Sequence, residues 1–378
     1  MDEYLVGLLE KLVNTDSGTG DEEGLARVAG LVKAEFERLG FEWKVFKAPD
    51  RSQHYYAAND GAGPGGAEKV LLIAHLDTVF PKGTAGKRRF SIEGDLARGP
   101  GVSDCKSGVV TIIGALQQLI ARHREGVKGL GLGIGCLFNT DEETGSPGSR
   151  PFIEELARQS KAVLVVEPAE GENITISRKG IGRFRLQVFG KAAHSGSNYQ
   201  EGSNAIVALA RQIIDIHHLT RLDEGITFNT GVISGGVRPN VIPDYAEAEI
   251  DLRITHAGQI PNALEDLQRV TASTGVPGTF ARLTGEITRP PMPETPANIQ
   301  LFYRLKKVAA EMGLPLGTFK SGGGSDANFT AALGTPTLDG LGPIGGGHHS
   351  ESEFLSLPSL QQRIDLLSRF LQSGFMNI

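Results

Sequence analysis

The sequence predicts an α/β protein whose mixed sheet, flanked by helices, is interrupted by a smaller inserted α+β domain. Short apolar runs alternate with helical patterns in the first part of the chain, and strands with one polar face follow. Buried-strand and helix patterns return after the Pro-rich stretch 288–296. The 378 residues also exceed what one compact core usually holds, which favours two domains.

Residues 1–178 have the pattern of a sheet covered by helices. Apolar residues recur with helical spacing over residues 4–13, 22–39, 108–123 and 151–159. Short continuous apolar runs, typical of strands buried on both faces, cover residues 69–74, 132–139 and 162–166. The second helix is expected to end at Gly40, a residue that suits a helix C-cap. Because strands and helices of these lengths alternate, we expect a mostly parallel sheet.

The pattern changes near Lys179. Residues 183–189 alternate polar and apolar side chains, as a strand with one solvated face does. The elements expected next are a helix over 204–218, strands over 226–233 and 244–254, a helix over 262–272 and a strand over 279–286. This β-α-β-β-α-β order is that of the ferredoxin-like motif. We therefore expect one domain formed by residues 1–178 and 288–378, and an inserted domain over residues 179–287.

Charge and cysteine content exclude several classes of protein. The net charge is −6 and no basic run is present, so the sequence favours neither a nucleic-acid partner nor an anionic membrane surface. No apolar run reaches membrane-spanning length, and the first residues are acidic and amphipathic, unlike a signal peptide. Two cysteines, Cys105 and Cys136, are too few for a disulfide framework, which predicts a cytoplasmic location.

A histidine and an aspartate follow the first expected buried strand. His75 and Asp77 lie two residues apart at the carboxyl end of the run 69–74, where open α/β sheets place their sites. Both side chains then point the same way, so one can ligate a metal while the other orients the imidazole. A strand-end histidine beside a turn aspartate has the same pattern, so this pair alone decides nothing.

Two single acids stand in similar positions. Asp104 lies in the Gly-rich run 99–108 (GPGVSDCKSG), where the glycines let the backbone approach a ligand. An aspartate that caps a helix is the alternative there. Glu167 ends a run of four aliphatic residues, where burying it unpaired would be costly. A glutamate that reaches solvent at the strand end is the alternative.

Two further groups complete the set. Asp141, Glu142 and Glu143 follow the run 132–139, and neighbouring acids are costly to pack unless a cation or a proton relieves them. A solvated first helical turn would also suit these acids. In the later run GGGHHSE, either His348 or His349 can complete a metal shell, unless both simply lie on an exposed loop.

The coincidence of these signals indicates a metal site, since residues at the strand ends of one sheet converge in space. A catalytic site built on a nucleophilic side chain fits the sequence less well. There is no GxSxG motif, and the acidic surroundings of Cys105 would raise the pKa of its thiol. The loop GGGSD lacks the lysine of a P-loop, and no GxGxxG motif opens a βαβ unit with an acid downstream.

Five motifs in order, HLDTVFPKG, GPGVSDCKSG, NTDEETG, VVEP and GGGHHSESE, resemble those of a family of dinuclear zinc amidohydrolases. The family includes glutamate carboxypeptidase (carboxypeptidase G), aminoacyl peptidases, acetylornithine deacetylase and succinyl-diaminopimelate desuccinylase. The match covers nearly the whole chain, and the run HLDTVFPKG followed by GPG leans toward the carboxypeptidase G branch. The resemblance implies a zinc-peptidase-like sheet and an inserted lid that pairs two subunits.

The same resemblance implies a role for each matching residue. Asp104 would bridge two Zn²⁺ ions, with His75 and Glu167 completing one shell and Glu143 and His349 the other. His349 is preferred to His348 because the family places its ligand just before Ser or Thr in this loop. Glu142 would be the general base, and Asp77 would orient His75. A non-proline cis peptide bond is expected between Asp104 and Cys105.

In the inserted domain, the resemblance implies residues that contact the substrate. His194, in AHSG, matches a histidine that reaches the partner subunit's active site and holds the oxyanion. Asn240, in RPNVIP, and Arg253, in DLRI, match residues that bind the substrate's carboxylate. Ser325, in GGGSD, is expected to line the substrate pocket. Taken without the family, His194 is a surface-loop histidine and Arg253 a polar strand residue.

The expected function is hydrolysis of an amide bond next to a free carboxylate, in a small peptide or an N-acyl amino acid. The alternative within the same chemistry is a deacylase of N-acetyl or N-succinyl amino acids. A non-catalytic metal-dependent binding protein is a third reading, although it predicts a missing base or ligand. Mixed histidine and carboxylate ligands do not fix the metal, so Co²⁺ or Mn²⁺ could replace zinc.

Overall fold

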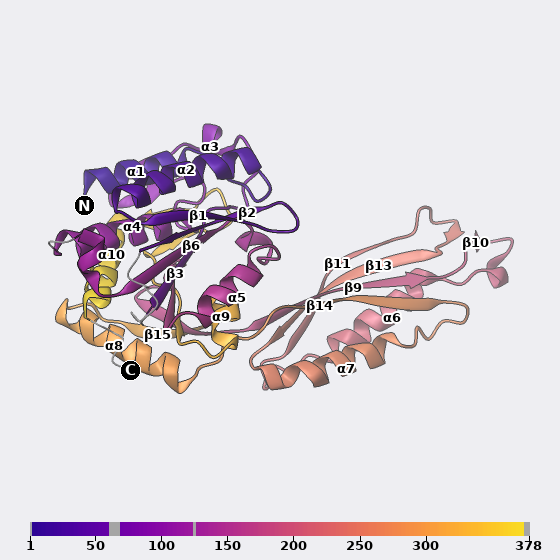
Figure 1. Ribbon diagram of the computed structural model, residues 1–378. Coiled ribbons are helices and arrows are strands. Elements are labelled where there is room, and N and C mark those ends of the chain that lie inside the picture. The colour runs from indigo at the N-terminus through magenta and orange to yellow at the C-terminus, as the bar shows by residue number, and fades with distance from the viewer. Residues whose placement is uncertain (1, 60–68, 124–125, 374–378) are drawn as a thin grey trace. The chain divides into compact units, whose positions relative to one another are not determined.

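The structure, a computed structural model, describes residues 2–59, 69–123 and 126–373 (Figure 1). The expected fold is confirmed: a mixed sheet flanked by helices is joined to an α+β part. The chain forms two compact units. The first comprises Met1–Ser177, Glu294–Ser321 and Ser325–Ile378, and the second comprises Arg178–Pro293 and Gly322–Gly324.

A six-stranded sheet is the centre of the first unit. Its strands, in spatial order, are β1 (Glu42–Lys47), β2 (Gln53–Ala58), β6 (Gly133–Asn139), β3 (Lys69–His75), β7 (Ala162–Val165) and β16 (Thr337–Leu338). The last four run parallel to one another, whereas β1 and β2 join as an antiparallel hairpin at the β6 edge. All seven residues of β6 are buried, as expected of a strand covered on both faces.

Helices cover both faces of this sheet (Figure 1). The helices on one face are α1 (Glu3–Val13), α2 (Glu22–Arg38), α4 (Lys106–Ala121) and α10 (Leu357–Gln372). They share one apolar core with Val70, Leu72 and Ala74, the side chains of β3 that point to this face. The other face is covered by α5 (Arg150–Arg158) and α9 (Ala327–Ala332), which pack on each other.

Helix α4 is central because it contacts β3 and three other helices, α1, α2 and α10. Gly114 makes this close packing possible. A Cβ atom at this position would lie 2.8 Å from Leu5 and 3.0 Å from Ile364. Any larger side chain there would push α1 or α10 away from the core.

The helix ends follow from the sequence. The side chain of Asp21 accepts the N–H of Gly24 at the start of α2, and that of Ser356 accepts the N–H of Ser359 at the start of α10. Helix α8 (Pro296–Glu311) is capped by Thr295 and begins with a proline, the residue whose missing N–H costs least at this position.

Smaller elements complete the first unit. A second sheet has the order β17 (Gly345–Gly346), β18 (Phe354–Ser356), β5 (Leu96–Arg98) and β4 (Ser91–Glu93). The remaining elements are α3 (Thr84–Lys87) and the strand pair β15 (Gly317–Ser321) and β8 (Asn173–Arg178). The small sheet matters for function, since it brings the segment after residue 344 beside the segment after residue 98.

The second unit is a four-stranded antiparallel sheet with two helices on one face (Figure 1). The sheet order is β11 (Thr227–Gly235), β13 (Tyr245–Ile254), β9 (Gly180–Phe189) and β14 (Phe280–Arg289), and the helices are α6 (Ala205–His217) and α7 (Ile260–Thr271). The short pair β10 (Ala193–His194) and β12 (Val241–Ile242) lies outside this sheet. The element order is that of the ferredoxin-like motif.

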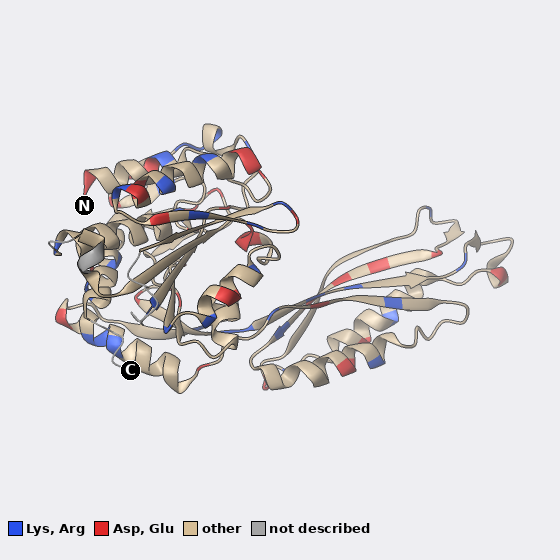
Figure 2. Cartoon of the chain, in the orientation of Figure 1, with Lys and Arg blue, Asp and Glu red and all other residues tan. Residues whose placement is uncertain are grey.

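The uncovered face of this sheet is charged. Figure 2 shows basic and acidic segments along its strands, and the structure pairs Arg183 with Asp251 and Arg185 with Glu247 across β9 and β13. Both arginines are more than half exposed, so these cross-strand pairs contribute little to stability. Within the part of the chain that the structure describes, no helix is both long and apolar enough to cross a membrane.

Candidate metal centre

The parallel strands of the first unit deliver polar side chains to one edge of the sheet. β3 ends at His75, which lies opposite Asn139, the last residue of β6. Glu142 and Glu143 follow β6, and Glu167 follows β7. Because β6, β3 and β7 run in the same direction, these side chains lie at the carboxyl edge, where open α/β sheets carry their sites.

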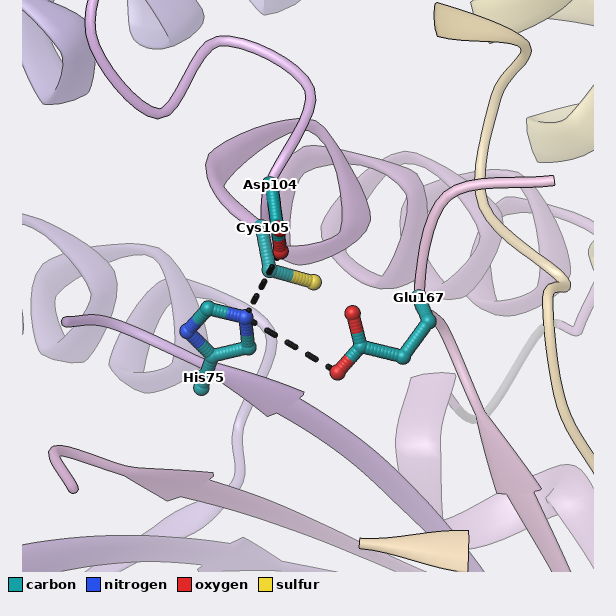
Figure 3. Close-up of side chains that lie close together, drawn as sticks. All are labelled: His75, Asp104, Cys105 and Glu167. Carbon is teal, nitrogen blue, oxygen red and sulfur yellow. Dashed lines mark hydrogen bonds and ion pairs between the residues drawn. The ribbon is translucent and has the colours of Figure 1, made fainter. Parts of the chain in front are cut away.

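His75, Asp104 and Glu167 form the first group of ligand-type side chains. The Nε2 atom of His75 lies 2.9 Å from Oδ1 of Asp104 and 3.8 Å from Oε1 of Glu167. Figure 3 shows the imidazole pointing toward both carboxylates. His75 is 1% exposed and Glu167 8% exposed, so this group is closed to solvent on most sides.

Asp104, Glu143 and His349 form the second group. The Nε2 atom of His349 lies 3.3 Å from Oδ2 of Asp104 and 3.1 Å from Oε2 of Glu143. The His349 side chain is 55% exposed, and its backbone has a φ of 61°, which places it on a tight surface turn. The second group is therefore far more open to solvent than the first.

Asp104 belongs to both groups and uses one oxygen for each. Its Oδ1 faces His75 and its Oδ2 faces His349. The peptide bond that follows it, Asp104–Cys105, is cis. Because its two oxygens face different groups, this carboxylate could bridge two cations, one in each group.

Asp77 connects the two sides of the centre from behind. Its Oδ1 lies 3.3 Å from Nδ1 of His75, and its backbone carbonyl oxygen accepts from the same nitrogen at 3.0 Å. Hydrogen bonding at Nδ1 leaves Nε2 of His75 to face Asp104. The hydroxyl of Thr19 donates to Oδ2 of Asp77 at 2.7 Å, so the orienting carboxylate is itself held in place.

The charges of the centre shift its pKa values strongly. Burial and the charges of Asp104 and Glu142 raise the pKa of Glu143 to about 8, although the charge of His75 opposes this shift. Burial raises the pKa of Glu167 well above its ordinary value. Acids crowded together in this way bind protons until a cation relieves them.

The pKa values of His75 and His349 are both raised, whereas burial alone lowers the pKa of an imidazole. The hydrogen bond with Asp104 raises the pKa of His349 to about 9. Burial opposes a charge on His75, but Glu167, Asp104 and Asp77 together raise its pKa well above the ordinary value. Burial would raise the pKa of Asp104, but hydrogen bonds from His349 and His75 outweigh it and hold that pKa well below the usual range.

The donor set fits two divalent cations. In each group the ligand atoms lie within 4.8 Å of one another. Around tetrahedral zinc, with bonds of about 2.0–2.2 Å, neighbouring N and O ligands are separated by about 3.4 Å. The separations of 2.9–3.8 Å in the two groups bracket this value. Cys105 lies beside the first group, but burial raises the pKa of its thiol and Sγ donates to the carbonyl oxygen of Val166.

Glu142 lies beside this cluster without belonging to either ligand group. Its backbone N–H donates to Oδ1 of Asp77 at 3.2 Å. Its negative charge helps to raise the pKa of Glu143, Glu167 and His349, so it acts on residues of both ligand groups. Asp141, the first acid of the same run, faces away and accepts the N–H groups of Gly148 and Ser149.

Ser325 is 2% exposed, and its hydroxyl donates to the buried Asp339 at 2.5 Å. Asp339 follows β16 at the same sheet edge, and its charge acts on Glu167. The hydroxyl of Ser325 is therefore occupied by Asp339. His348 also stands apart from the ligand groups, with Nε2 3.1 Å from the hydroxyl of Ser103.

Glu353 and Thr19 are two polar residues at the centre that the sequence did not single out. Glu353 is 1% exposed and accepts backbone N–H groups from the loop that carries Asp104. Thr19 holds Asp77. Glu353 ends the run GGGHHSESE and Thr19 lies outside the five motifs, but residue type alone marks neither, because one acts on backbone amides and the other acts through a second side chain.

His194 and Asn240 lie together in the second unit. β10 pairs His194 with Val241, and the N–H of Ser195 donates to the carbonyl oxygen of Asn240 at 3.1 Å. Both His194 and Asn240 are exposed. The Nδ1 atom of His194 accepts the N–H groups of Gly196 and Ser197, so in the neutral ring the proton resides on Nε2.

Arg253 lies near the far end of β13, in the same unit. Its Nε and Nη2 atoms donate to the two oxygens of Asp251 at 2.8 and 3.1 Å, and Nη1 donates to the carbonyl oxygen of Gly322 at 3.2 Å. The guanidinium is therefore held in a fixed plane, and it keeps N–H groups beyond these three bonds to offer to an anion.

An α/β sheet edge that presents two histidine and carboxylate groups around one shared aspartate defines a metallohydrolase. The model of Peptidase family M20/M25/M40 matches residues 71–373, which is most of the chain. The protein belongs to this family of peptidases.

Similar proteins span nearly the whole chain. Carboxypeptidase G2 of Pseudomonas sp. (strain RS-16) is 32% identical over 371 residues, covering 97% of this chain and 88% of that protein. Acetylornithine deacetylase of Proteus mirabilis (strain HI4320) is 26% identical over 380 residues, covering 95% and 92%. The crystal structure of a tripeptidase from Staphylococcus aureus has the same fold, with a TM-score of 0.84 at 22% identity over 99% of this chain and 98% of that one.

Proposed function

We propose that the protein is a two-zinc hydrolase that cuts an amide bond next to a free carboxylate, as a carboxypeptidase or dipeptidase does. One observation carries this proposal: Asp104 lies between two groups of ligand-type side chains, with Glu142 beside both. His75 and Glu167 would hold one ion, and Glu143 and His349 the other. Similarity to carboxypeptidase G2 supports the choice of substrate class.

Zinc suits a donor set of imidazole nitrogen and carboxylate oxygen, and Co²⁺ or Mn²⁺ could occupy the same ligands. Two bound cations would lower the pKa of a shared water toward about 7 and polarise the amide carbonyl. Glu142 would take the proton of that water and give it to the leaving amine. Its backbone is fixed by Asp77, so its carboxylate is carried on a rigid loop.

His194 would stabilise the negative charge that develops on the carbonyl oxygen. Because Nδ1 accepts two backbone N–H groups, Nε2–H is the donor of the neutral ring, as an oxyanion requires. Arg253 would bind the free carboxylate in a two-pronged contact, with Asn240 as a further polar contact. The second unit would act as a lid that excludes water when it closes.

His194 and Arg253 of one chain cannot contact the same small substrate. β13 alone carries the chain from Tyr245 to Arg253, a path of roughly 25 Å at about 3.3 Å per residue, and His194 lies by the start of this strand. An extended dipeptide spans about 7 Å. We therefore propose that His194 and Asn240 act in the active site of a second copy of the chain.

An unpaired strand edge supports the homodimer. Among the described strands, β11 has β13 as its partner on one side and none on the other. On this edge Val232 and Ile233 are 54% and 59% exposed, and on the adjoining α6 Val207 and Ile214 are 44% and 57% exposed. An exposed apolar strand edge is a template for pairing, so a second β11 is its natural cover.

The test combines metal analysis with a substrate panel. Purified protein is measured for bound metal and assayed against N-acyl-glutamates, dipeptides and N-acetyl amino acids. We expect two ions per chain and metal-dependent release of an amino acid from substrates with a free carboxylate. A protein that binds no divalent ion, or that hydrolyses nothing in the panel with two ions bound, would contradict the proposal.

A deacylase is the second candidate, and similarity to acetylornithine deacetylase over most of the chain favours it. The same panel separates the two functions, because a deacylase prefers short acyl groups over peptides. Both cysteines are free and buried, which fits a reducing compartment, and we place the protein in the cytoplasm on this ground.

A further inference from the structure

Glu353 links the two loops that carry ligand-type side chains. It stands four residues after His349 and directly before β18. Phe354 of β18 pairs with Arg98, the last residue of β5, and the chain continues from Arg98 into the loop 99–104. Strand register therefore places Glu353 against this loop, where its side chain is 1% exposed.

Every hydrogen bond that the structure gives the Glu353 carboxylate goes to a backbone amide of this loop. Oε2 accepts the N–H of Gly101 at 2.8 Å. Oε1 accepts the N–H groups of Ser103 and Asp104 at 2.9 and 3.0 Å. Three amides held by one buried carboxylate fix the direction of the backbone at Asp104.

The direction of this backbone decides where the Asp104 oxygens point. Oδ1 faces His75 and Oδ2 faces His349, and a rotation of the loop would break one contact or the other. Gly101 has a φ of 70°, which is the left-handed conformation that glycine adopts readily, so this residue does not by itself fix the direction of the loop. The three bonds from Glu353 supply that constraint.

We propose that Glu353 is a positioning residue that holds the Gly101–Asp104 loop so that Asp104 can face both ligand groups at once. This inference rests on the proposed function, in which the two groups bind two ions. It assigns a role to an acid that lies outside both ligand groups. It also explains why the His349 loop and the Asp104 loop are joined, since Glu353 belongs to the first and binds the second.

Two substitutions give a graded test. Glu353→Gln keeps one oxygen to accept from Ser103 and Asp104 but turns an amide donor toward the N–H of Gly101. Glu353→Ala removes all three acceptors. Glu351→Gln is the matched control, since Glu351 lies in the same loop and is exposed.

The first readout is Zn²⁺ binding to the metal-free protein, measured by competition with a chelator. We expect the more weakly bound of the two ions to bind about tenfold more weakly to Glu353→Gln and about 100-fold more weakly to Glu353→Ala. This is the range found for residues that orient ligands. Glu351→Gln should bind both ions as the native protein does. Native affinity for both ions in Glu353→Gln would overturn the proposal, as would a lower Tm with unchanged affinity.

The second readout needs no metal and no activity. In the metal-free protein, hydrogen–deuterium exchange of the peptide over residues 99–106 should be faster in Glu353→Gln and fastest in Glu353→Ala, if the latter folds. Unchanged exchange in Glu353→Gln would contradict the inference even if the native protein proved to bind no metal. Failure of the proposed function is a separate result, since it appears in the native protein before any substitution.

Discussion

The carboxylate of Asp77 accepts the backbone N–H of Glu142 at 3.2 Å. The strand end that carries His75 is thereby joined to the loop that carries the proposed base. The same carboxylate accepts the N–H of Glu143 at 3.2 Å and the hydroxyl of Thr19 at 2.7 Å. One buried aspartate thus contacts His75, the backbone of Glu143 and the backbone of Glu142, that is, a proposed ligand on each side of the centre and the proposed base.

Replacing Asp77 should therefore weaken metal binding and catalysis together. In Asp77→Asn, one of the two carboxylate oxygens becomes an amide donor, so the N–H of either Glu142 or Glu143 loses its acceptor. We expect metal affinity and kcat/KM each to fall about 10–100-fold. Thr19→Val removes a single hydrogen bond and should cost less than tenfold in either quantity. Equal effects from the two variants would argue against this role of Asp77.

Glu142 should be needed for chemistry and not for metal binding. In Glu142→Gln we expect kcat to fall about 10²–10⁴-fold, the usual contribution of a general base, with the metal content unchanged. Metal analysis and steady-state kinetics on the same preparation check this. Loss of an ion together with activity would make Glu142 a ligand instead of the base.

Arg253 should act on substrate affinity. Arg253→Ala is expected to raise KM at least tenfold for substrates with a free carboxylate and to leave kcat nearly unchanged, because a uniform binding contact is lost. Arg183→Ala is the matched control, since Arg183 lies on the same sheet face and also pairs with Asp251. If the native enzyme hydrolyses amides without a carboxylate equally well, the assignment of Arg253 is wrong.

His194 should work across a dimer. His194→Ala and Glu142→Gln homodimers should each be nearly inactive. A mixed dimer should recover up to about half of the native activity per dimer, because one of its two sites has both residues native. The measurement is the activity of a co-expressed, doubly tagged heterodimer. No recovery, or a stable and active monomer in a sizing experiment, would place the whole site within one chain.

Metal binding should release protons. In the metal-free protein the pKa of Glu143 is about 8 and that of His349 about 9, so both side chains hold a proton at pH 7. A cation displaces these protons, so affinity should rise as the pH is raised toward about 9. Calorimetry in buffers of different ionisation enthalpy counts the protons released. Affinity that stays constant between pH 6 and pH 9 would contradict the prediction.

The sequence indicated the strand ends well, because buried parallel strands have a strong signature. β3, β6 and β7 lie within one or two residues of their expected bounds, and His75 and Glu167 follow from them. The hairpin of β1 and β2 carried no such signal, since four of the six residues of β1 are exposed. It adds antiparallel strands to a sheet that the sequence described as mostly parallel.

Contacts that depend on strand register or on backbone amides could not be predicted from the sequence. Glu351 and Glu353 are alike in type and spacing, and only the pairing of β18 with β5 places Glu353 in the interior. In the same way, Asp141 shares a run with Glu142 and Glu143, but its carboxylate is used by the backbone of Gly148 and Ser149. The sequence shows that acids cluster here, and the fold decides which way each one points.

The two halves of the centre differ in their access to water: His75 is 1% exposed, whereas the His349 side chain is 55% exposed. If two ions bind as proposed, we expect the ion on the His349 side to exchange with solvent much faster than the one held behind Asp104. Dilution or mild chelation should then leave folded molecules with one ion, which the proposed two-ion mechanism predicts to be inactive. The specific activity of a preparation will accordingly follow the trace metal in its buffer, and a second kind of ion supplied there will enter on the His349 side first.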